Sequence, residues 1–521
     1  MIKLNDIKVS VDYTDDEIKK AIAIKLKISA NDIKSFDVVR RSIDARYKNV
    51  RFSLGISADI EGKDEHTNED TQLNFQSIKI NRNDFSRPVV VGAGPAGMFA
   101  ALVLAECGIQ PILIERGQSI EERKKQIDHF QNTGELNTES NVCFGEGGAG
   151  TFSDGKLVTR VNDPLCKYIL NTFVEHGASK DILIDAKPHI GTDILSDILV
   201  KIRKRIISLG GEISFGEKLE DISCKNGKIE SAKTSKREIK CESLILATGH
   251  GARDIYYLLK NRNIIIEPKG FAMGVRIEHK RSMIDKAIYG SYADHKRLGA
   301  AMYSLKGNFS GRSVYSFCMC PGGEVINAST ERDGICVNGM SYNARDGENS
   351  NAAVVVQMNP KDWGEDALAG IEFQRKIERL CFQKAGGDFS VPIQKFGDFE
   401  KNTVSSGFGD INSSLKGKTN FINIPDILGE DISSSIKQAI NYWERIIEGY
   451  SSSDALLSAV ESRTSSPIRV TRGGDMQSVS IAGIYPCGEG AGYAGGIMSA
   501  AIDGIKCALE IINKIKKETD K

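Results

Sequence analysis

The segment around Gly92–Gly97 constrains the fold more than any other part of the sequence. A short β-branched run, Pro88–Val91, leads into Gly-Ala-Gly-Pro-Ala-Gly, and the stretch Pro95–Cys107 that follows is rich in Ala, Leu and Met. A second apolar run, Pro111–Glu115, comes next. Strand, glycine turn, helix and strand in this order predict a βαβ unit of a Rossmann-like α/β domain.

Each part of this turn has a physical role in binding a dinucleotide. Gly92 permits the tight turn, Gly94 lets the backbone approach a pyrophosphate, and Gly97 lets the helix pack closely on the sheet. The helix N-terminus offers free N–H groups to the phosphates. Glu115, at the end of the next strand, can accept hydrogen bonds from a ribose diol. We therefore expect cofactor contacts from Gly92, Ala93, Gly94, Pro95, Ala96, Gly97, Glu115 and Arg116.

The glycine turn alone does not show whether the dinucleotide is FAD or NAD, and the C-terminal segment favours FAD. The run Ser243–Ala247 predicts a buried strand that ends in Ala-Thr-Gly, and near the C-terminus a strand ends in Gly488-Glu489 before a helix that begins near Gly495-Gly496. Together with the first turn, these motifs resemble the glutathione-reductase-like FAD superfamily. The usual terminal acid there is Asp, and this chain has Glu489. The resemblance implies non-covalent FAD, held also by Ala247, Thr248, Gly249, Gly488, Glu489, Gly495, Gly496 and Ile497.

A closer resemblance covers almost the whole chain. The segments Gly145–Leu157, Phe317–Gly323 and Glu461–Pro467, with Ala247–His250 and the C-terminal glycine block, look like the bacterial FAD-dependent dehydrogenase family of unassigned substrate. That family also has a small domain before its flavin fold. The resemblance implies FAD and a redox role, and it implies no substrate.

The glycine-rich stretch Gly145–Lys156 is expected to line the isoalloxazine ring, mostly on this resemblance; an ordinary turn is the alternative. Its expected contacts come from Gly147, Gly148, Ala149, Thr151, Ser153 and Lys156. Gly145, Gly147 and Gly150 have the G-x-G-x-x-G spacing, but the residues after them do not open a helix. We therefore expect no second dinucleotide domain, so NAD(P)H, as a transient electron donor, would bind in an open groove.

The sequence offers only weak candidates for catalysis: Lys156, Arg276 and Arg463. An arginine in the middle region can bind an anionic substrate by a bidentate contact, although most arginines are solvated or structural. Cys318 and Cys320 form C-x-C rather than the usual C-x-x-C of a redox dithiol, so we expect two buried thiols on one face of a strand, with redox chemistry as the alternative. The eleven cysteines show no metal-binding spacing, and we expect no metal.

The composition indicates which classes of partner this chain can bind. Lys+Arg and Asp+Glu both number 69, which gives no support for nucleic-acid binding. The N-terminus is polar and charged, unlike a signal peptide, and no apolar run reaches the length of a membrane span. We therefore expect a cytoplasmic protein whose partner is a small-molecule substrate. The oligomeric state stays open.

The predicted fold is α/β, with a discontinuous Rossmann-like FAD-binding domain, an inserted α+β substrate domain and a small N-terminal α+β domain. The expected boundaries are 1–86 for the N-terminal domain, 87–270 and 466–521 for the FAD domain, and 271–465 for the substrate domain. The expected function is an FAD-dependent dehydrogenase or reductase of a small metabolite, with hydride or electron transfer through flavin N5. The alternatives are a flavin-dependent RNA-modifying enzyme and a non-catalytic flavin-binding scaffold or sensor.

Overall fold

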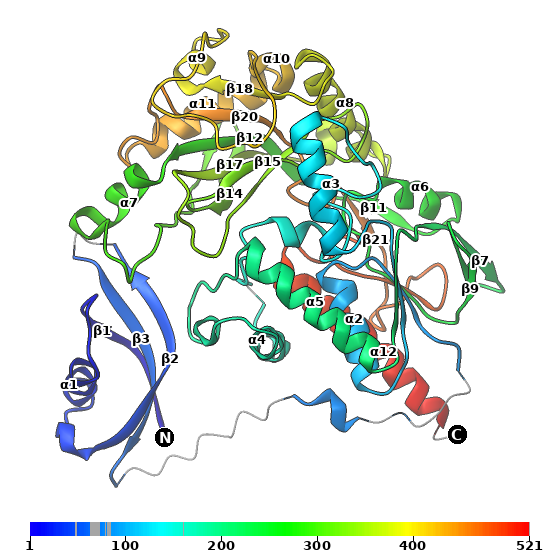
Figure 1. The fold of residues 1–521 in the computed structure, drawn as a ribbon, viewed down its shortest axis with the longest axis horizontal. Coiled ribbons are helices and arrows are strands. Elements are labelled where there is room, and N and C mark those ends of the chain that lie inside the picture. The colour runs from blue at the N-terminus through cyan, green and yellow to red at the C-terminus, as the bar shows by residue number, and fades with distance from the viewer. Residues whose placement is uncertain (47–48, 63–72, 79, 81–84, 160, 520–521) are drawn as a thin grey trace.

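The computed structural model describes residues 1–521 except 47–48, 63–72, 79, 81–84, 160 and 520–521. Its elements form a small N-terminal unit, a unit built on a parallel sheet, and a unit built on a seven-stranded sheet (Figure 1). The glycine motifs of the sequence lie in the second unit and at its border with the third.

The N-terminal unit is a three-stranded antiparallel sheet with one helix. The strands run in the order β1 (Ile2–Val9), β3 (Arg51–Ile60) and β2 (Ile33–Asp44), and the helix is α1 (Asp15–Leu26). Thr14 caps α1 by accepting from the Glu17 N–H, while the Glu17 carboxylate accepts from Ser10. Backbone bonds from Arg41 to Ile184 and from Ala186 to Arg41 join β2 to the second unit.

The second unit contains a five-stranded parallel sheet. Its strands run in the order β22 (Ile484–Pro486), β10 (Leu244–Leu246), β4 (Val89–Val91), β5 (Ile112–Glu115) and β6 (Glu212–Phe215). A small antiparallel sheet of β7 (Leu219–Lys225), β8 (Lys228–Thr234) and β9 (Glu238–Lys240) adjoins it. Because β22 pairs with β10, the end of the chain completes a sheet that β4 begins.

The helices of the second unit are α2 (Pro95–Glu106), α3 (Ile120–Thr133), α4 (Leu165–Glu175), α5 (Thr192–Ser208), α6 (Arg253–Asn261) and α12 (Ile497–Thr519). Helix α2 is apolar on all sides and almost wholly buried, as expected for a helix inside a core. It packs against α12 and α5 (Figure 1). A Cβ on Gly504 of α12 would lie 2.0 Å from the carbonyl oxygen of Ala96 in α2. Helices α2 and α12 therefore pack with their backbones in contact.

The third unit contains a sheet in the order β13 (Lys306–Phe309), β14 (Arg312–Cys320), β17 (Asn349–Met358), β12 (Phe271–Lys280), β20 (Leu456–Glu461), β18 (Val391–Lys395) and β19 (Thr419–Phe421). Helices lie over it: α7 (Arg281–Tyr289), α8 (Ala369–Lys384), α9 (Phe396–Glu400), α10 (Pro425–Leu428) and α11 (Glu430–Trp443) (Figure 1). Two short pairs, β15 (Glu324–Asn327) with β16 (Val337–Met340) and β11 (Ile266–Pro268) with β21 (Ile468–Val470), complete the unit.

The predicted α/β fold class is confirmed, with β4, α2 and β5 in the order that the first glycine turn indicates. The last helix, expected near Gly495-Gly496, begins at Ile497 as α12. Strand β2 begins at Ile33, and residues 47–48, between β2 and β3, lie outside the described residues. Within the described chain, no helix is both long and apolar enough to cross a membrane.

Candidate functional site

Five separate segments of the sequence meet at the carboxyl end of the parallel sheet. They are residues 92–97, 115–117, 145–156, 247–250 and 488–497. We call residues 92–97 the glycine turn and residues 145–156 the glycine loop. The Gly147 N–H donates to the Ala93 carbonyl at 2.7 Å, which ties the loop to the turn. A Cβ on Gly488 would lie 3.0 Å from the Ala96 Cβ, and one on Gly150 would lie 3.2 Å from Ile497. The motifs singled out in the sequence therefore form one site.

The glycines of the turn differ in what surrounds them. A Cβ on Gly97 would lie 1.9 Å from the Gly92 carbonyl oxygen, and one on Gly92, whose φ is +103°, would lie 2.6 Å from the Ala247 oxygen. A Cβ on Gly94 would meet no protein atom nearer than the Gly148 Cα, at 3.9 Å. Protein packing therefore explains Gly92 and Gly97 but does not explain Gly94. Close approach of a ligand does explain it.

The first turn of α2 fits a pyrophosphate. Gly94 is the N-cap of the helix, and no side chain caps the helix amides. Uncapped N–H groups at a helix N-terminus attract phosphate oxygens through their partial positive charge. The residues present thus suit the pyrophosphate of a dinucleotide.

Glu115 joins the glycine turn to the glycine loop. Its Oε2 accepts from the Ala93 N–H at 2.8 Å, and its Oε1 accepts from Gly117 and Gly145 at 2.8 and 3.0 Å. The carboxylate is buried, and its expected bond to a ribose remains a prediction. The Arg116 guanidinium lies over the Phe144 ring and donates to Asp254 at 2.5 Å.

A buried arginine that the sequence analysis did not select supports the glycine loop. Arg123, on α3, is fully buried and donates to the carbonyl oxygens of Asn141, Val142, Glu146 and Gly148 at 2.7–2.9 Å. Burial lowers the pKa of Arg123 to about 10, so its guanidinium stays charged at neutral pH. The signal in the sequence was an arginine within the apolar stripe of Ile120, Ile127 and Phe130.

Two side chains of the glycine loop that are expected to contact the cofactor form hydrogen bonds within the loop, and their contact with the cofactor stays a prediction. Thr151 is fully buried, and its hydroxyl donates to the Glu146 carbonyl at 3.1 Å. The Ser153 hydroxyl donates to Gly150 and accepts from the Gly155 N–H. These side chains hold the loop in shape because its tight turns leave carbonyls without helix or sheet partners. Lys156 is half-buried and donates to the Met319 carbonyl, which links the loop to β14.

Arg276 and Arg463, the other weak catalytic candidates, are occupied by protein partners. Arg276 is fully buried and donates to Glu461 at 2.9 Å, to Asn351 at 2.6 Å and to the Cys318 carbonyl. Arg463 donates to Glu378 at 2.7 Å and to Thr330 at 2.6 Å. Both arginines therefore have protein partners for their guanidinium groups, and a catalytic role for either stays a prediction.

The expected placement of the two C-x-C thiols on one face is wrong. The register of β14 shifts between Phe317 and Cys320, and Cys318 has φ +40°. The bulge turns Cys318 outward, where it is exposed, while Cys320 is buried. Surrounding protein nevertheless raises the pKa of Cys318 to about 12.

Glu489 follows Gly488 and lies beside the strand end Ala247–Gly249. A Cβ on Gly490 would lie 1.9 Å from the Thr248 carbonyl oxygen, and the Glu489 Oε2 accepts from the His250 N–H at 2.8 Å. About a quarter of the Glu489 side chain is accessible (28%). Cβ atoms on Gly495 and Gly496, directly before α12, would meet nothing within 4 Å.

One group of possible metal ligands occurs in the described part of the chain: Cys487, Asp503 and Cys507. Both oxygens of Asp503 accept from Arg472, at 2.6 and 3.0 Å, and one also accepts from the Gly488 N–H. Hydrogen bonding to Cys507, together with burial, raises the pKa of the Cys487 thiol well above its usual range. The donor set does not suit a cation, because a guanidinium already neutralises the carboxylate and the Cys487 thiol keeps its proton.

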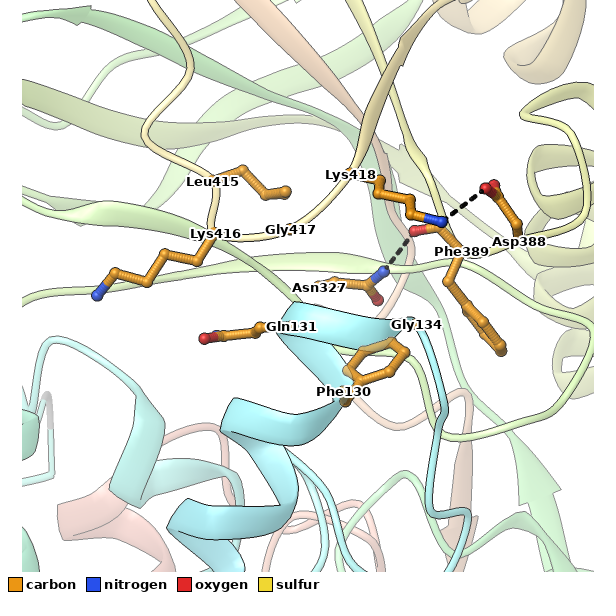
Figure 2. A pocket seen from close by; sticks show the side chains of 10 residues that line it. All are labelled: Phe130, Gln131, Gly134, Asn327, Asp388, Phe389, Leu415, Lys416, Gly417 and Lys418. Carbon is orange, nitrogen blue, oxygen red and sulfur yellow. Dashed lines mark hydrogen bonds and ion pairs between the residues drawn. The ribbon is translucent and has the colours of Figure 1, made fainter.

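A shallow hollow lies away from these motifs, between the end of α3 and the third unit (Figure 2). Phe130 lies at one side of it, and Lys418 forms an ion pair with Asp388 at the other, 3.5 Å apart. No residue of the glycine turn or the glycine loop lines it. We assign it no role in binding the dinucleotide.

Three sequence families match this chain. Residues 270–464 match "FAD-dependent protein, C-terminal domain-like", residues 87–128 match "FAD binding domain", and residues 1–59 match a domain of unknown function. An uncharacterized protein from Clostridium beijerinckii is 43% identical over 98% of this chain and 99% of its own length.

Solved structures resemble the chain more distantly. Glycine oxidase from Bacillus cereus is 11% identical, with 82% of this chain and 98% of that one covered and a TM-score of 0.36. A flavoprotein/dehydrogenase from Cytophaga hutchinsonii is 13% identical, with 82% and 78% covered and a TM-score of 0.39. At these TM-scores the assignment depends on the sequence families.

Proposed function

We propose that this chain is an FAD-dependent dehydrogenase or reductase of a small metabolite. The chain belongs to the same family as the Clostridium beijerinckii protein, and its residues 270–464 match the C-terminal domain of FAD-dependent proteins. The match of residues 87–128 to an FAD binding domain covers β4, α2 and β5, the segment that carries the glycine turn. Membership of the glutathione-reductase-like superfamily, inferred above from motifs, is part of this proposal.

The observation that carries the proposal is Gly94. It is the one glycine of the turn that packing inside the protein leaves unexplained, and it stands at the uncapped N-terminus of α2. A side chain there would occupy the space that a pyrophosphate needs, while the protein itself would tolerate one. This distinguishes a cofactor site from a glycine turn that serves the fold alone.

The remaining residues have roles in binding and orientation. Bound FAD supplies hydride or electron transfer. The uncapped amides of α2 hold the pyrophosphate, Glu115 faces the ribose, and the glycine loop, supported by Arg123, lies along the ring. The N-terminus of α12 faces the opposite edge of the ring, where Gly495 and Gly496 leave room for a close approach. Lys156, which joins the loop to β14, is the residue that we expect to contact the substrate.

Non-covalent FAD is tested by acid precipitation of the purified protein. FAD should appear in the supernatant, and flavin that stays with the pellet, or FMN in its place, would contradict the proposal. A second experiment mixes the holoprotein anaerobically with NADH, NADPH and a panel of small metabolites and follows the flavin absorbance. Complete reduction by one compound supports an enzyme, while retained FAD that no donor reduces favours the non-catalytic scaffold.

Nicotinamide is expected to act, if at all, as a transient donor. Among the described residues one sheet is wholly parallel, and no α-helix follows the second G-x-G-x-x-G spacing before α4. Rapid mixing should therefore show weak saturation with NADH and NADPH. Tight, micromolar saturation by either would contradict this part of the proposal.

A further inference from the structure

We infer that the N-terminal unit positions Lys156. Its contacts with the second and third units fix residues 154–157, the end of the glycine loop that carries this lysine. Residues 1–59 match a domain of unknown function, and the glycine motifs assign that unit no role. The inference rests on the proposed function, in which Lys156 is expected to contact the substrate.

The first contact joins β2 to the segment that follows α4. The Arg41 N–H donates to the Ile184 carbonyl at 2.7 Å, and the Arg41 carbonyl accepts from the Ala186 N–H at 2.8 Å. The Arg41 guanidinium donates to Asp185 at 2.8 Å and to Asp181 at 3.0 Å. This arginine, on the edge strand of the N-terminal sheet, therefore binds the segment with both its backbone and its side chain.

The segment that Arg41 binds continues into a pairing with the glycine loop. The Leu157 N–H donates to the Pro188 carbonyl at 2.9 Å, and the Ile190 N–H donates to the Gly155 carbonyl at 3.0 Å. These two bonds flank Lys156 in a short antiparallel pairing. Because residues 186 and 188 are close neighbours in the chain, holding the first limits the movement of the second.

The second contact joins the N-terminal unit to the third unit. His295 Nε2 lies 3.0 Å from a carboxylate oxygen of Asp12, and Arg297 donates to the Tyr13 carbonyl at 3.2 Å. The Arg297 guanidinium also lies over the Tyr13 ring, 4.3 Å from its centre. Burial opposes the charge of Arg41, while hydrogen bonds, one of them to Tyr13, hold its pKa well above its ordinary value. The two contacts therefore meet at Tyr13.

A second route leads from this contact to the glycine loop. Residues 295–297 come shortly before Met302, whose sulfur accepts from Arg345 at 3.5 Å. Arg345 is buried and donates to both carboxylate oxygens of Asp154, to one of them at 2.9 Å. Asp154 is buried as well. The third unit thus holds the glycine loop two residues before Lys156.

Lys156 lies between these two attachments. Its side chain is 25% exposed, and its ammonium lies 3.7 Å from a carboxylate oxygen of Asp154 and donates to the Met319 carbonyl of β14. A lysine has a flexible four-carbon stem, so a loose backbone would let the ammonium leave this position. Fixing the backbone on both sides of Lys156 therefore keeps the ammonium where the glycine loop meets β14.

The N-terminal unit also bridges the two units that the glycine loop joins. Units of one chain that share polar interfaces move relative to each other unless something holds them. One contact of the N-terminal unit lies on the second unit and the other lies on the third. Opening either contact should therefore loosen the pairing on both sides of Lys156.

The test compares hydrogen–deuterium exchange in wild-type holoprotein, Arg41→Glu and Arg40→Glu. Glutamate at position 41 repels the two aspartates that the arginine binds and should open the first contact. We expect the amides of Leu157 and Ile190 to exchange about tenfold faster, which corresponds to about 1.4 kcal/mol of local stability. Arg40 is the neighbouring exposed residue of β2 and forms no ion pair with the described residues, so Arg40→Glu should exchange as the wild type.

A second readout is the reaction of the Lys156 amine with acetic anhydride, followed by mass spectrometry. Lys156 should be labelled faster in Arg41→Glu than in the wild type, with Lys306, exposed on β13, as the internal reference. Combining Arg41→Glu with Asp185→Arg restores the ion pair with its charges exchanged. This double variant should return both the labelling and the exchange towards the wild type.

Arg41→Pro is the second variant, because it removes the N–H that donates to Ile184, a bond outside the pairing of β2 with β3. Unchanged exchange at Leu157 and Ile190 in both Arg41→Glu and Arg41→Pro, or unchanged labelling of Lys156, would overturn the inference. A loss of protection that the exchanged pair does not restore would also overturn it, since that marks a general loss of structure. Protein that binds no flavin would instead overturn the proposed function, which none of these readouts measures.

Discussion

Replacing Arg123 with methionine tests how much the cofactor site depends on its support. Methionine fills most of the volume of the arginine stem, so the substitution removes the guanidinium with a small cavity cost. The guanidinium donates to four carbonyl oxygens of residues 141–148 and lies over the Phe152 ring, 4.8 Å from its centre. Arg123→Met therefore leaves these carbonyls without donors while the glycines of the loop are unchanged.

The size of the effect follows from the burial of these bonds. A hydrogen bond to a charged group contributes about 1.5–3 kcal/mol, so four bonds give an upper sum of about 6–12 kcal/mol. Part of this is recovered, because a loosened loop can turn its carbonyls towards water. We expect a net loss of about 3–5 kcal/mol, the range for breaking a buried charged network. If the loop must be ordered to hold FAD, the smaller figure already corresponds to a loss of affinity of about a hundredfold.

The assay is the dissociation constant of FAD, measured from flavin fluorescence at equilibrium, together with the urea midpoint of flavin release. The release midpoint is preferred to a free energy of unfolding because a chain of several units does not unfold in two states. Arg262→Met, which removes an exposed ion pair with Asp221, serves as the control and should change neither quantity. Unchanged affinity and midpoint in Arg123→Met would refute the claim that this arginine organises the loop.

Four further predictions concern individual glycines and the two thiols of β14. Gly94→Ala should keep its circular dichroism spectrum and lose FAD. Gly97→Ala should lose the fold, because its Cβ would lie 1.9 Å from the Gly92 carbonyl oxygen. FAD retained in Gly94→Ala would contradict the placement of the pyrophosphate. Alkylation of Cys318 should be slow at neutral pH, because only the thiolate reacts and the pKa of this thiol is about 12. The rate should rise about tenfold per pH unit towards that pKa. Fast labelling at pH 7 would be inconsistent with this. Doubly serine-substituted Cys318 and Cys320 should still allow complete flavin reduction, and a loss of electron uptake on titration would reveal a redox pair. Gly496→Leu should fold and bind FAD but make the flavin potential more negative, because the ring is held away from the N–H groups of α12; an unchanged potential would remove this helix from the site.

The parts of the site that the sequence predicts are local ones. The run Val89–Val91, the turn after it and the apolar helix from Pro95 are read correctly because a strand, a glycine turn and a helix each follow from neighbouring residues. The C-terminal Gly488-Glu489 and the start of the last helix at Ile497 were found in the same way. That the glycine turn and the C-terminal segment meet in one site could be expected only from the resemblance. The residues themselves do not indicate how close the two segments lie in the fold.

What the sequence did not predict depends on contacts between distant segments. Arg123 reaches the carbonyls of another loop, and the pairing of Gln374 with His250 joins residues from two units. The separate faces of Cys318 and Cys320 arise from a bulge, which alternation along a strand does not anticipate. Side chains such as Thr151 have the chemistry of a ligand contact, and only the shape of the loop shows that their hydroxyls are used within it.

The pairing of β22 with β10 fixes when this protein can become functional during its synthesis. The glycine turn leaves the ribosome early, but the fifth strand of its sheet begins at Ile484 and the helix that packs on α2 begins at Ile497. Until these residues emerge, β10 has an unpaired edge and α2 lacks one of its two helical partners, so the nascent chain exposes surfaces that favour aggregation. A chain terminated before Ile484 would contain the complete glycine turn and still lack the acid, the strand and the helix that close the cofactor site.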